Sequence, residues 1–156
     1  MIRTFAAALI LSTLPGCMGQ GPFPQIQFCL RDRSNTADFI ATMKAISAKY
    51  DMHYVDRSAQ VDSELRSLDK YPGYKGLTIS AHRNDGLGWA ASKFGPSGHD
   101  VAIGFSEGSN RDEARRFADS VREVLRKTWD VHEVPADKGA VPGCGVTGSS
   151  AASRRE

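Results

Sequence analysis

The chain has 156 residues, with 20 Lys plus Arg, 18 Asp plus Glu and a formal net charge of +2. Its basic residues are interleaved with acidic ones, as in Arg31-Asp32-Arg33, so it lacks the clustered basic surplus of a nucleic-acid-binding protein. The central part of about 110 residues suffices for one domain with one core, but not for two.

The N-terminus has the layout of an export signal. Arg3 supplies one positive charge, and residues 5–14 form an apolar stretch that ends at Pro15 and Gly16. A membrane-spanning helix needs about 20 apolar residues, so this stretch is too short to be one. We therefore expect residues 1–16 to be a signal peptide that is removed.

The residues at the expected cleavage site are Leu14-Pro15-Gly16-Cys17. They resemble the lipobox of bacterial lipoproteins, in which the signal is cut before a cysteine that becomes the acylated N-terminus, although Pro15 departs from the usual small or aliphatic residue. The resemblance implies lipid on Cys17 as a membrane anchor. Because Met18 is not the aspartate of inner-membrane retention, it also implies the outer membrane, facing the periplasm. The alternative is an ordinary secretory signal with Cys17 as a plain cysteine.

The mature chain is predicted to contain one domain between two polar ends. Residues 17–25 are rich in Gly and Pro, which is typical of a tether. Residues 136–156 are predicted to form a Gly/Ser-rich tail, so the domain is expected to cover residues 26–135. Export permits Cys29 and Cys144 to form a disulfide. The alternative is two free thiols.

The first half of the domain alternates strands and helices. A helix start is indicated by Ser34 or Asn35 as the cap, followed by one stripe of apolar residues. In chain order we predict a strand over 26–31, a helix over about 36–50, a strand over about 53–57, and a short helix around 61–68 that ends at 71–73.

The second half begins with three strands separated by turn residues. Asn84-Asp85-Gly86 and Gly95-Pro96-Ser97-Gly98 supply the backbone angles that hairpins require. A long helix then follows a cap at Ser109 or Asn110. The predicted elements are strands over 77–82, 88–94 and 101–105, a helix over 111–129, and a last strand over 131–134.

This order of elements resembles a ferredoxin-like α/β sandwich with an extra hairpin strand. The predicted fold class is α+β, with a mostly antiparallel sheet and two long helices on one face. The opposite face is then flat, moderately polar and lined by small residues. Its predicted members are Gln27, Arg31, Thr78, Ser80, His82, Ala102 and Gly104.

The domain shows no catalytic, metal or cofactor motif. None of the four histidines, at positions 53, 82, 99 and 132, lies at a helical ligand spacing from another or in a Cys/His cluster. Ser80, His82 and Asp85 form the one grouping to test for an enzyme, but no acidic residue is placed to complete a triad. We therefore predict a protein that is not an enzyme and that has no metal and no cofactor.

A protein partner is expected to bind through loops 84–88 and 95–100 or through the open sheet face. The predicted contact residues are Asn84, Asp85, Leu87, Trp89 and His99. An exposed Trp89 would anchor a partner, because tryptophan often dominates interface energetics. The alternative is that Trp89 is a buried core aromatic.

The chain is small, carries a predicted export signal and has no catalytic or cofactor motif. In these respects it resembles small periplasmic lipoprotein immunity proteins, which neutralise antibacterial toxins delivered by neighbouring cells. The resemblance implies a lipid-anchored protein-binding module that inhibits a secreted toxin. The alternative is a structural or assembly lipoprotein of the cell envelope or of a secretion system. No nucleic-acid partner is expected.

Overall fold

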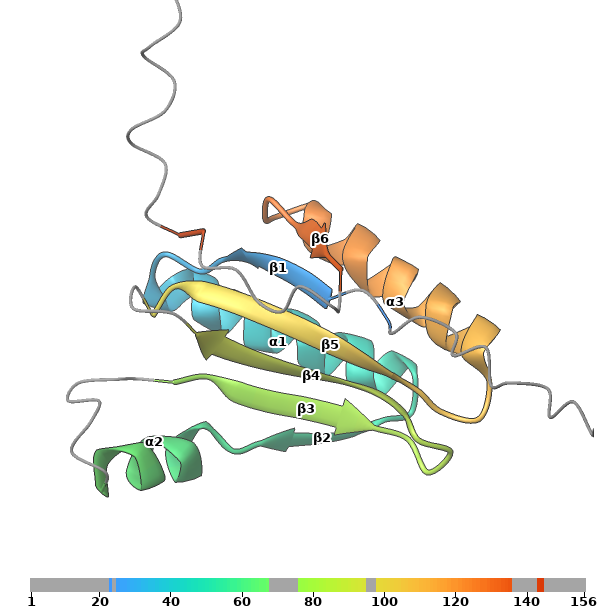
Figure 1. Cartoon of the computed structure of the whole chain (residues 1–156), viewed down its shortest axis with the longest axis horizontal. Coiled ribbons are helices and arrows are strands. Elements are labelled where there is room, and N and C mark those ends of the chain that lie inside the picture. The colour runs from blue at the N-terminus through green and yellow to red at the C-terminus, as the bar shows by residue number, and fades with distance from the viewer. Residues whose placement is uncertain (1–22, 24, 68–75, 95–97, 136–142, 145–156) are drawn as a thin grey trace, which may run out of the picture.

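The computed structural model of this chain describes residues 23, 25–67, 76–94, 98–135 and 143–144 (Figure 1). The predicted order of strands and helices is confirmed within these residues. The elements are β1 (Gln25–Cys29), α1 (Arg33–Lys49), β2 (His53–Asp56), α2 (Ser58–Ser67), β3 (Thr78–His82), β4 (Leu87–Phe94), β5 (Asp100–Glu107), α3 (Arg111–Arg126) and β6 (His132–Val134).

The strands form one six-stranded sheet in the order β2-β3-β4-β5-β1-β6. Every pair of neighbouring strands is antiparallel, so the predicted α+β class is confirmed. Strands β2 to β5 follow one another as a meander, and β1 lies between β5 and β6. The likeness to a ferredoxin-like sandwich stays a prediction.

The start of α1 corrects the predicted cap. Asp32, not Ser34 or Asn35, is the N-cap, because its carboxylate accepts the Asn35 backbone N–H at 2.8 Å. The side chains of Ser34 and Asn35 instead donate to the same carboxylate. The Asn35 amide and the Ser34 hydroxyl lower the pKa of Asp32 below its usual 3.8. The helix therefore begins at residue 33, three residues before the predicted start.

The cap of α3 agrees with one of the two predicted residues. Asn110 is the N-cap, and its side-chain oxygen accepts the Glu113 backbone N–H at 3.1 Å. Asp112 and Glu113 lie in the first turn, where carboxylates interact favourably with the helix dipole.

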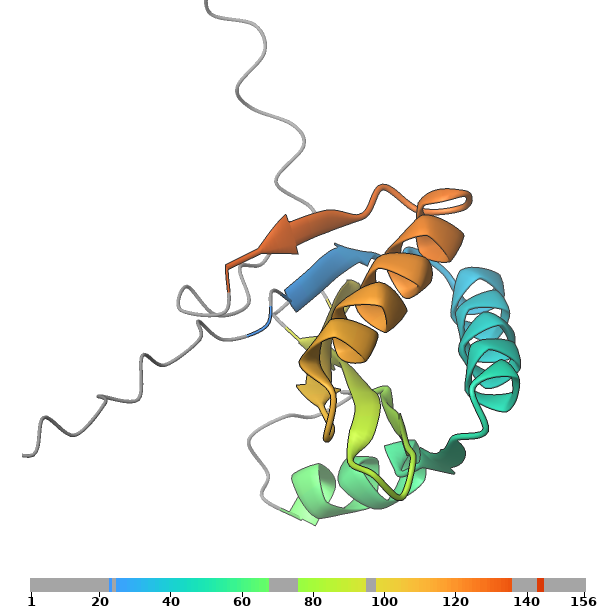
Figure 2. The same ribbon diagram turned by 90° about the vertical axis from the view of Figure 1, so that its right-hand side faces the viewer.

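Both long helices cover the same face of the sheet, as predicted (Figure 2). The main aromatic contact of this layer joins Phe28 of β1, Phe39 of α1 and Trp129, which follows α3. Their ring centres lie 5.3, 5.7 and 5.9 Å apart, and all three side chains are buried. At the other end of the layer, Tyr50 and Phe105 pack on Phe117 of α3.

Several predictions fall outside the described residues. These are the signal peptide, Cys17, most of the tether, the turn at 71–73, the loop residues 95–97 and the tail apart from residues 143 and 144. Within the described part of the chain, no helix is both long and apolar enough to cross a membrane.

The predicted disulfide between Cys29 and Cys144 is present, with its Cα atoms 5.6 Å apart. It lies beside Asp100, whose carboxylate is 3% exposed and is opposite Cys29 in the β1–β5 register. Asp100 Oδ1 accepts the backbone N–H groups of Gly143 at 2.6 Å and Cys144 at 2.7 Å. The two bonds satisfy a buried carboxylate and fix residues 143 and 144 against this end of the sheet.

Replacing both bridged cysteines, Cys29→Ser with Cys144→Ser, should lower the free energy of unfolding. The bridge spans 115 positions, and the chain-entropy model assigns such a loop about 4 to 5 kcal/mol. Urea denaturation of both proteins, with and without reductant, measures the difference. Cys17→Ser is the matched control, since it removes a cysteine outside the bridge. A wild-type midpoint that does not move with reductant contradicts this expectation.

Candidate functional site

Two of the five predicted contact residues are in the core. Leu87 is 1% exposed and Trp89 is 3% exposed, so neither side chain is available to a partner, and the alternative for Trp89 is the correct one. The reason is the alternation of side chains along β4. Residues 87, 89 and 91 point toward the helices, while residues 90 and 92 point away from them.

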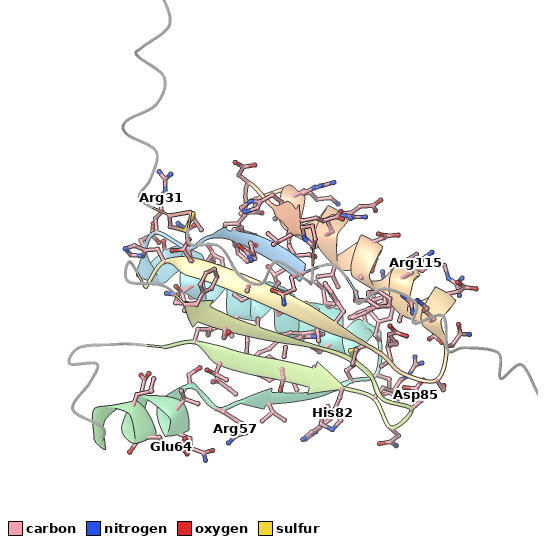
Figure 3. All side chains as sticks on the ribbon, viewed as in Figure 1. Arg31, Arg57, Glu64, His82, Asp85 and Arg115 are labelled. Atoms are coloured by element: carbon pink, nitrogen blue, oxygen red, sulfur yellow. A yellow bond between two sulfur atoms is a disulfide. The ribbon has the colours of Figure 1, made fainter. Side chains whose placement is uncertain are left out.

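The remaining three predicted residues do not form one surface. Asn84 and Asp85 lie in the β3–β4 hairpin, whereas His99 lies between β4 and β5. Consecutive hairpins of a meander leave the sheet at opposite ends, and the eight residues of β4 separate these two by roughly 25 Å. Figure 3 shows Asp85 at one end of the sheet and Arg31 at the other, and His99 lies at the Arg31 end because its carbonyl accepts the Leu30 N–H.

The β3–β4 hairpin is fixed to the start of α3 by charged groups. Asp85 accepts from the Arg83 guanidinium and from the Leu87 N–H at 3.1 Å, and Arg83 also contacts Glu113 at 2.8 Å. The hydrogen bond from Arg83 is the main reason that the pKa of Asp85 is lowered to about 2, and the Leu87 amide lowers it further. The two carboxylates raise the pKa of Arg83. Gly86 and Gly108 both have positive φ and allow the two turns to approach each other closely.

The grouping of Ser80, His82 and Asp85 is not assembled in the described residues. Asp85 is engaged by Arg83 and by the Leu87 amide. The ring that contacts His82 is that of His53. Without a carboxylate to orient the imidazole, the arrangement gives His82 no way to activate Ser80 as a nucleophile.

One other grouping of possible ligands lies within the described part of the chain. Cys29, Asp100 and Cys144 bring their ligand atoms within 4.8 Å of one another. The two sulfurs are bonded to each other, so they are not thiolates, and Asp100 Oδ1 is occupied by two backbone amides. The group therefore acts as a clamp on the chain and not as a metal site in this form.

Within the described residues, no helix or strand covers the sheet face away from α1 and α3 over β3, β4 and β5. The open face is defined here by the outward residues in the middle of these strands, without His82, Gly88, Phe94 and Asp100 near the strand ends. Its members are Thr78, Ser80, Ala90, Ser92, Ala102, Gly104 and Ser106. Each of them is exposed or half-buried. The prediction named Thr78, Ser80, Ala102 and Gly104, and it also named His82, which is exposed at the end of β3. It missed Ala90 and Ser92, which the alternation of residues 88–94 already indicated, and Ser106 of β5.

The face is closed at β1, which corrects the prediction for Gln27. Gln27 lies opposite Ala102 and so belongs to this face by register, yet it is only 2% exposed. The disulfide and Asp100 hold residues 143 and 144 against this end of the face. Arg31, also predicted for the face, follows β1 and lies outside the strand.

A cavity of about 420 Å³ lies at this closed end. Phe28, Phe94 and Trp129 are its aromatic lining, and its polar lining includes Arg31, Asn35, Asp130 and His132. Phe94 is outward-facing on β4, so the cavity adjoins the open face. Its volume falls in the range that admits a small molecule or a large side chain of another protein.

No protein family model, curated protein sequence or solved structure matches this chain.

Replacing Asp85 with asparagine should lower the melting temperature at neutral pH, because it removes the negative charge that pairs with Arg83. The contribution of Asp85 is present above its ordinary pKa of 3.8 and is lost as the pH falls through about 2, where the folded protein takes up the proton. The difference between wild type and Asp85→Asn should therefore shrink between pH 4 and pH 2. Thermal unfolding followed by circular dichroism measures it.

Asp130→Asn is the control for this experiment. Asp130 is exposed, and among the described residues it has no hydrogen bond or ion pair. Its replacement should leave the melting temperature almost unchanged at either pH. An Asp85→Asn effect that stays constant down to pH 2 would mean that the ion pair with Arg83 is not its cause.

Proposed function

We propose that this chain is a lipoprotein held to the outer membrane by lipid on Cys17, and that its periplasmic domain binds and inhibits a secreted antibacterial toxin. The observation that carries the binding part is the uncharged open face on a sheet whose other face is covered by α1 and α3. The Cys29–Cys144 disulfide supports the export part, because disulfides persist in oxidising compartments such as the periplasm.

The composition of the open face favours a protein partner over solvent. Charged residues make up 24% of the chain, but none of the seven residues of the open face is charged. A sheet face that meets only water usually carries polar and charged side chains. The centres of protein interfaces are instead depleted in charge. The open face therefore has the composition of an interface centre.

The dimensions of the open face set the area that a partner covers. The spacing of the strands and the rise per residue give β3 to β5 a flat area of roughly 400 Å². In a standard interface each partner buries about 800 Å². The residues around the open face must therefore supply the remaining contact area. At one end of the face the rim includes the cavity beside Phe94 and Trp129, which is large enough for an anchoring side chain of the partner.

The inhibition on this proposal is steric. The hairpin is held by Arg83 and Asp85, and the opposite end is held by the disulfide and Asp100, so the face between them is bounded by two fixed ends. A rigid surface loses little conformational entropy on binding. It can occlude a toxin's active site without any chemistry of its own.

Cys17→Ser should move the protein from the membrane fraction to the soluble periplasmic fraction. Acyl chains contribute about 0.8 kcal/mol per buried methylene, so their loss removes the anchor. Fractionation, labelling with radioactive palmitate and the mass of the N-terminal peptide measure the change. Wild-type protein that carries no label and retains residues 1–16 contradicts the proposed anchor.

Ala90→Arg and Gly104→Arg should abolish partner binding by placing a long charged side chain at the centre of the open face. Both should fold, since Ala90 is exposed and a Cβ on Gly104 meets no heavy atom within 4 Å. Capture of the toxin on the immobilised protein and survival of cells attacked by sibling cells are the two measurements. We expect at least about a 100-fold loss of affinity, equivalent to about 2.7 kcal/mol.

Ala45→Arg on α1 is the matched control, because it makes the same change at an exposed position on the opposite side of the domain. It should bind and protect as wild type does. Protection that survives Ala90→Arg would overturn the open face as the binding surface. Envelope proteins that co-purify with the wild type, in cells whose resistance is unaffected by deletion, would replace toxin inhibition with an assembly role.

A further inference from the structure

Two histidines lie directly opposite each other on neighbouring strands. His53 is the first residue of β2, His82 is the last residue of β3, and the antiparallel register pairs them. Their ring centres are 5.7 Å apart with an interplanar angle of 78°. All four histidines of the chain are among the described residues, and His53 and His82 are the two that the strand register places opposite each other. The pair was not apparent in the sequence because its members are far apart along the chain.

The backbone on both sides fixes the two positions. Asp51 adopts a left-handed conformation with φ of 53°, and the Met52 N–H donates to the Ser47 carbonyl at 2.9 Å, so the end of α1 leads directly to His53. On the other side of His82 the opposite residue is Gly88. A Cβ there would lie 2.5 Å from the Ala81 carbonyl oxygen, so Gly88 permits the close approach of β4 and leaves the His82 ring without a neighbouring side chain on that side.

In the described part of the chain, neither histidine ring forms a hydrogen bond or an ion pair with another residue. Both side chains are exposed. The adjacent cation, Arg83, is bound by Asp85 and Glu113. By contrast, the His99 ring contacts the Leu30 carbonyl oxygen at 3.1 Å, and His132 lies opposite Gln27.

We propose that His53 and His82 together bind a divalent transition-metal ion of the class that prefers imidazole, namely Zn²⁺, Ni²⁺ or Cu²⁺. With zinc–nitrogen bonds of about 2.1 Å, two imidazoles on one ion have ring centres roughly 5 to 6 Å apart. The observed separation of 5.7 Å meets this requirement. To bind one ion, the two rings must turn about their side-chain bonds so that one nitrogen of each points at a common position between the paired strands.

The proposed site is open and exchangeable. Among the described residues, no third Cys, Asp, Glu or His has a ligand atom grouped with the two rings. Two protein ligands leave the other coordination positions to water, or to a donor from a partner, whereas structural zinc sites use four protein ligands. The ion would join the edge strand β2 to β3, so its binding should stabilise this edge of the sheet.

Zinc titration of the full chain carrying Cys17→Ser, without a polyhistidine tag, tests the proposal. The substitution removes the remaining thiol, because Cys29 and Cys144 are bridged. Isothermal titration calorimetry with Zn²⁺ and Ni²⁺ should show one saturable site. In proton–nitrogen NMR spectra, the ring-nitrogen resonances of His53 and His82 alone should shift. The melting temperature should rise with added Zn²⁺.

His53→Ala and His82→Ala should each lower the affinity by at least about 10-fold, because loss of an outer-shell partner alone costs about 10- to 100-fold and these residues are direct ligands. His132→Ala is the matched control, since it removes an exposed histidine from the other edge strand, and it should bind as the parent does. His53→Gln and His82→Gln keep polar side chains of similar size in case alanine disturbs the strand. Absence of saturable binding below millimolar metal, or an equal loss in His132→Ala, overturns the proposal.

Discussion

The buried apolar side chains of the sheet point to one face, and their contact with α1 and α3 is the interaction on which the other features depend. Phe28, Phe39 and Trp129 join β1, α1 and the segment after α3 in one aromatic cluster at the closed end of the sheet. Burying each such side chain contributes about 1.5 to 3 kcal/mol. A slip of one residue in any strand would move its apolar side chains to the other face, so this packing also fixes the register.

The open face, which is the proposed binding surface, follows from this one-sided burial. Because both long helices lie on one face, the outward positions in the middle of β3 to β5 are left with small, uncharged side chains. The disulfide and the buried Asp100 close the face at β1, and the Arg83–Asp85 contact holds the turn at the other end. On the proposed function, binding and stability use different faces of the same strands, so the open face should tolerate substitutions that the helix-covered face would not.

The sequence predicted the order and the approximate bounds of every described element, because alternation and helical periodicity are local properties. It also indicated Asn110 as a cap and Cys29 with Cys144 as a pair. It misplaced the cap of α1, since Asp32, Ser34 and Asn35 are all good capping residues. Only the hydrogen bond from the Asn35 amide to Asp32 distinguishes them.

What the sequence alone determined, then, is which residues form strands and helices, and that the protein is of the α+β class. What only the tertiary structure decided is which residues meet. The burial of Trp89, the placement of Asn84 and His99 at opposite ends of the sheet, and the pairing of His53 with His82 all depend on strand register and on which face the helices cover. These relations join residues far apart in the chain, so no local pattern in the sequence records them.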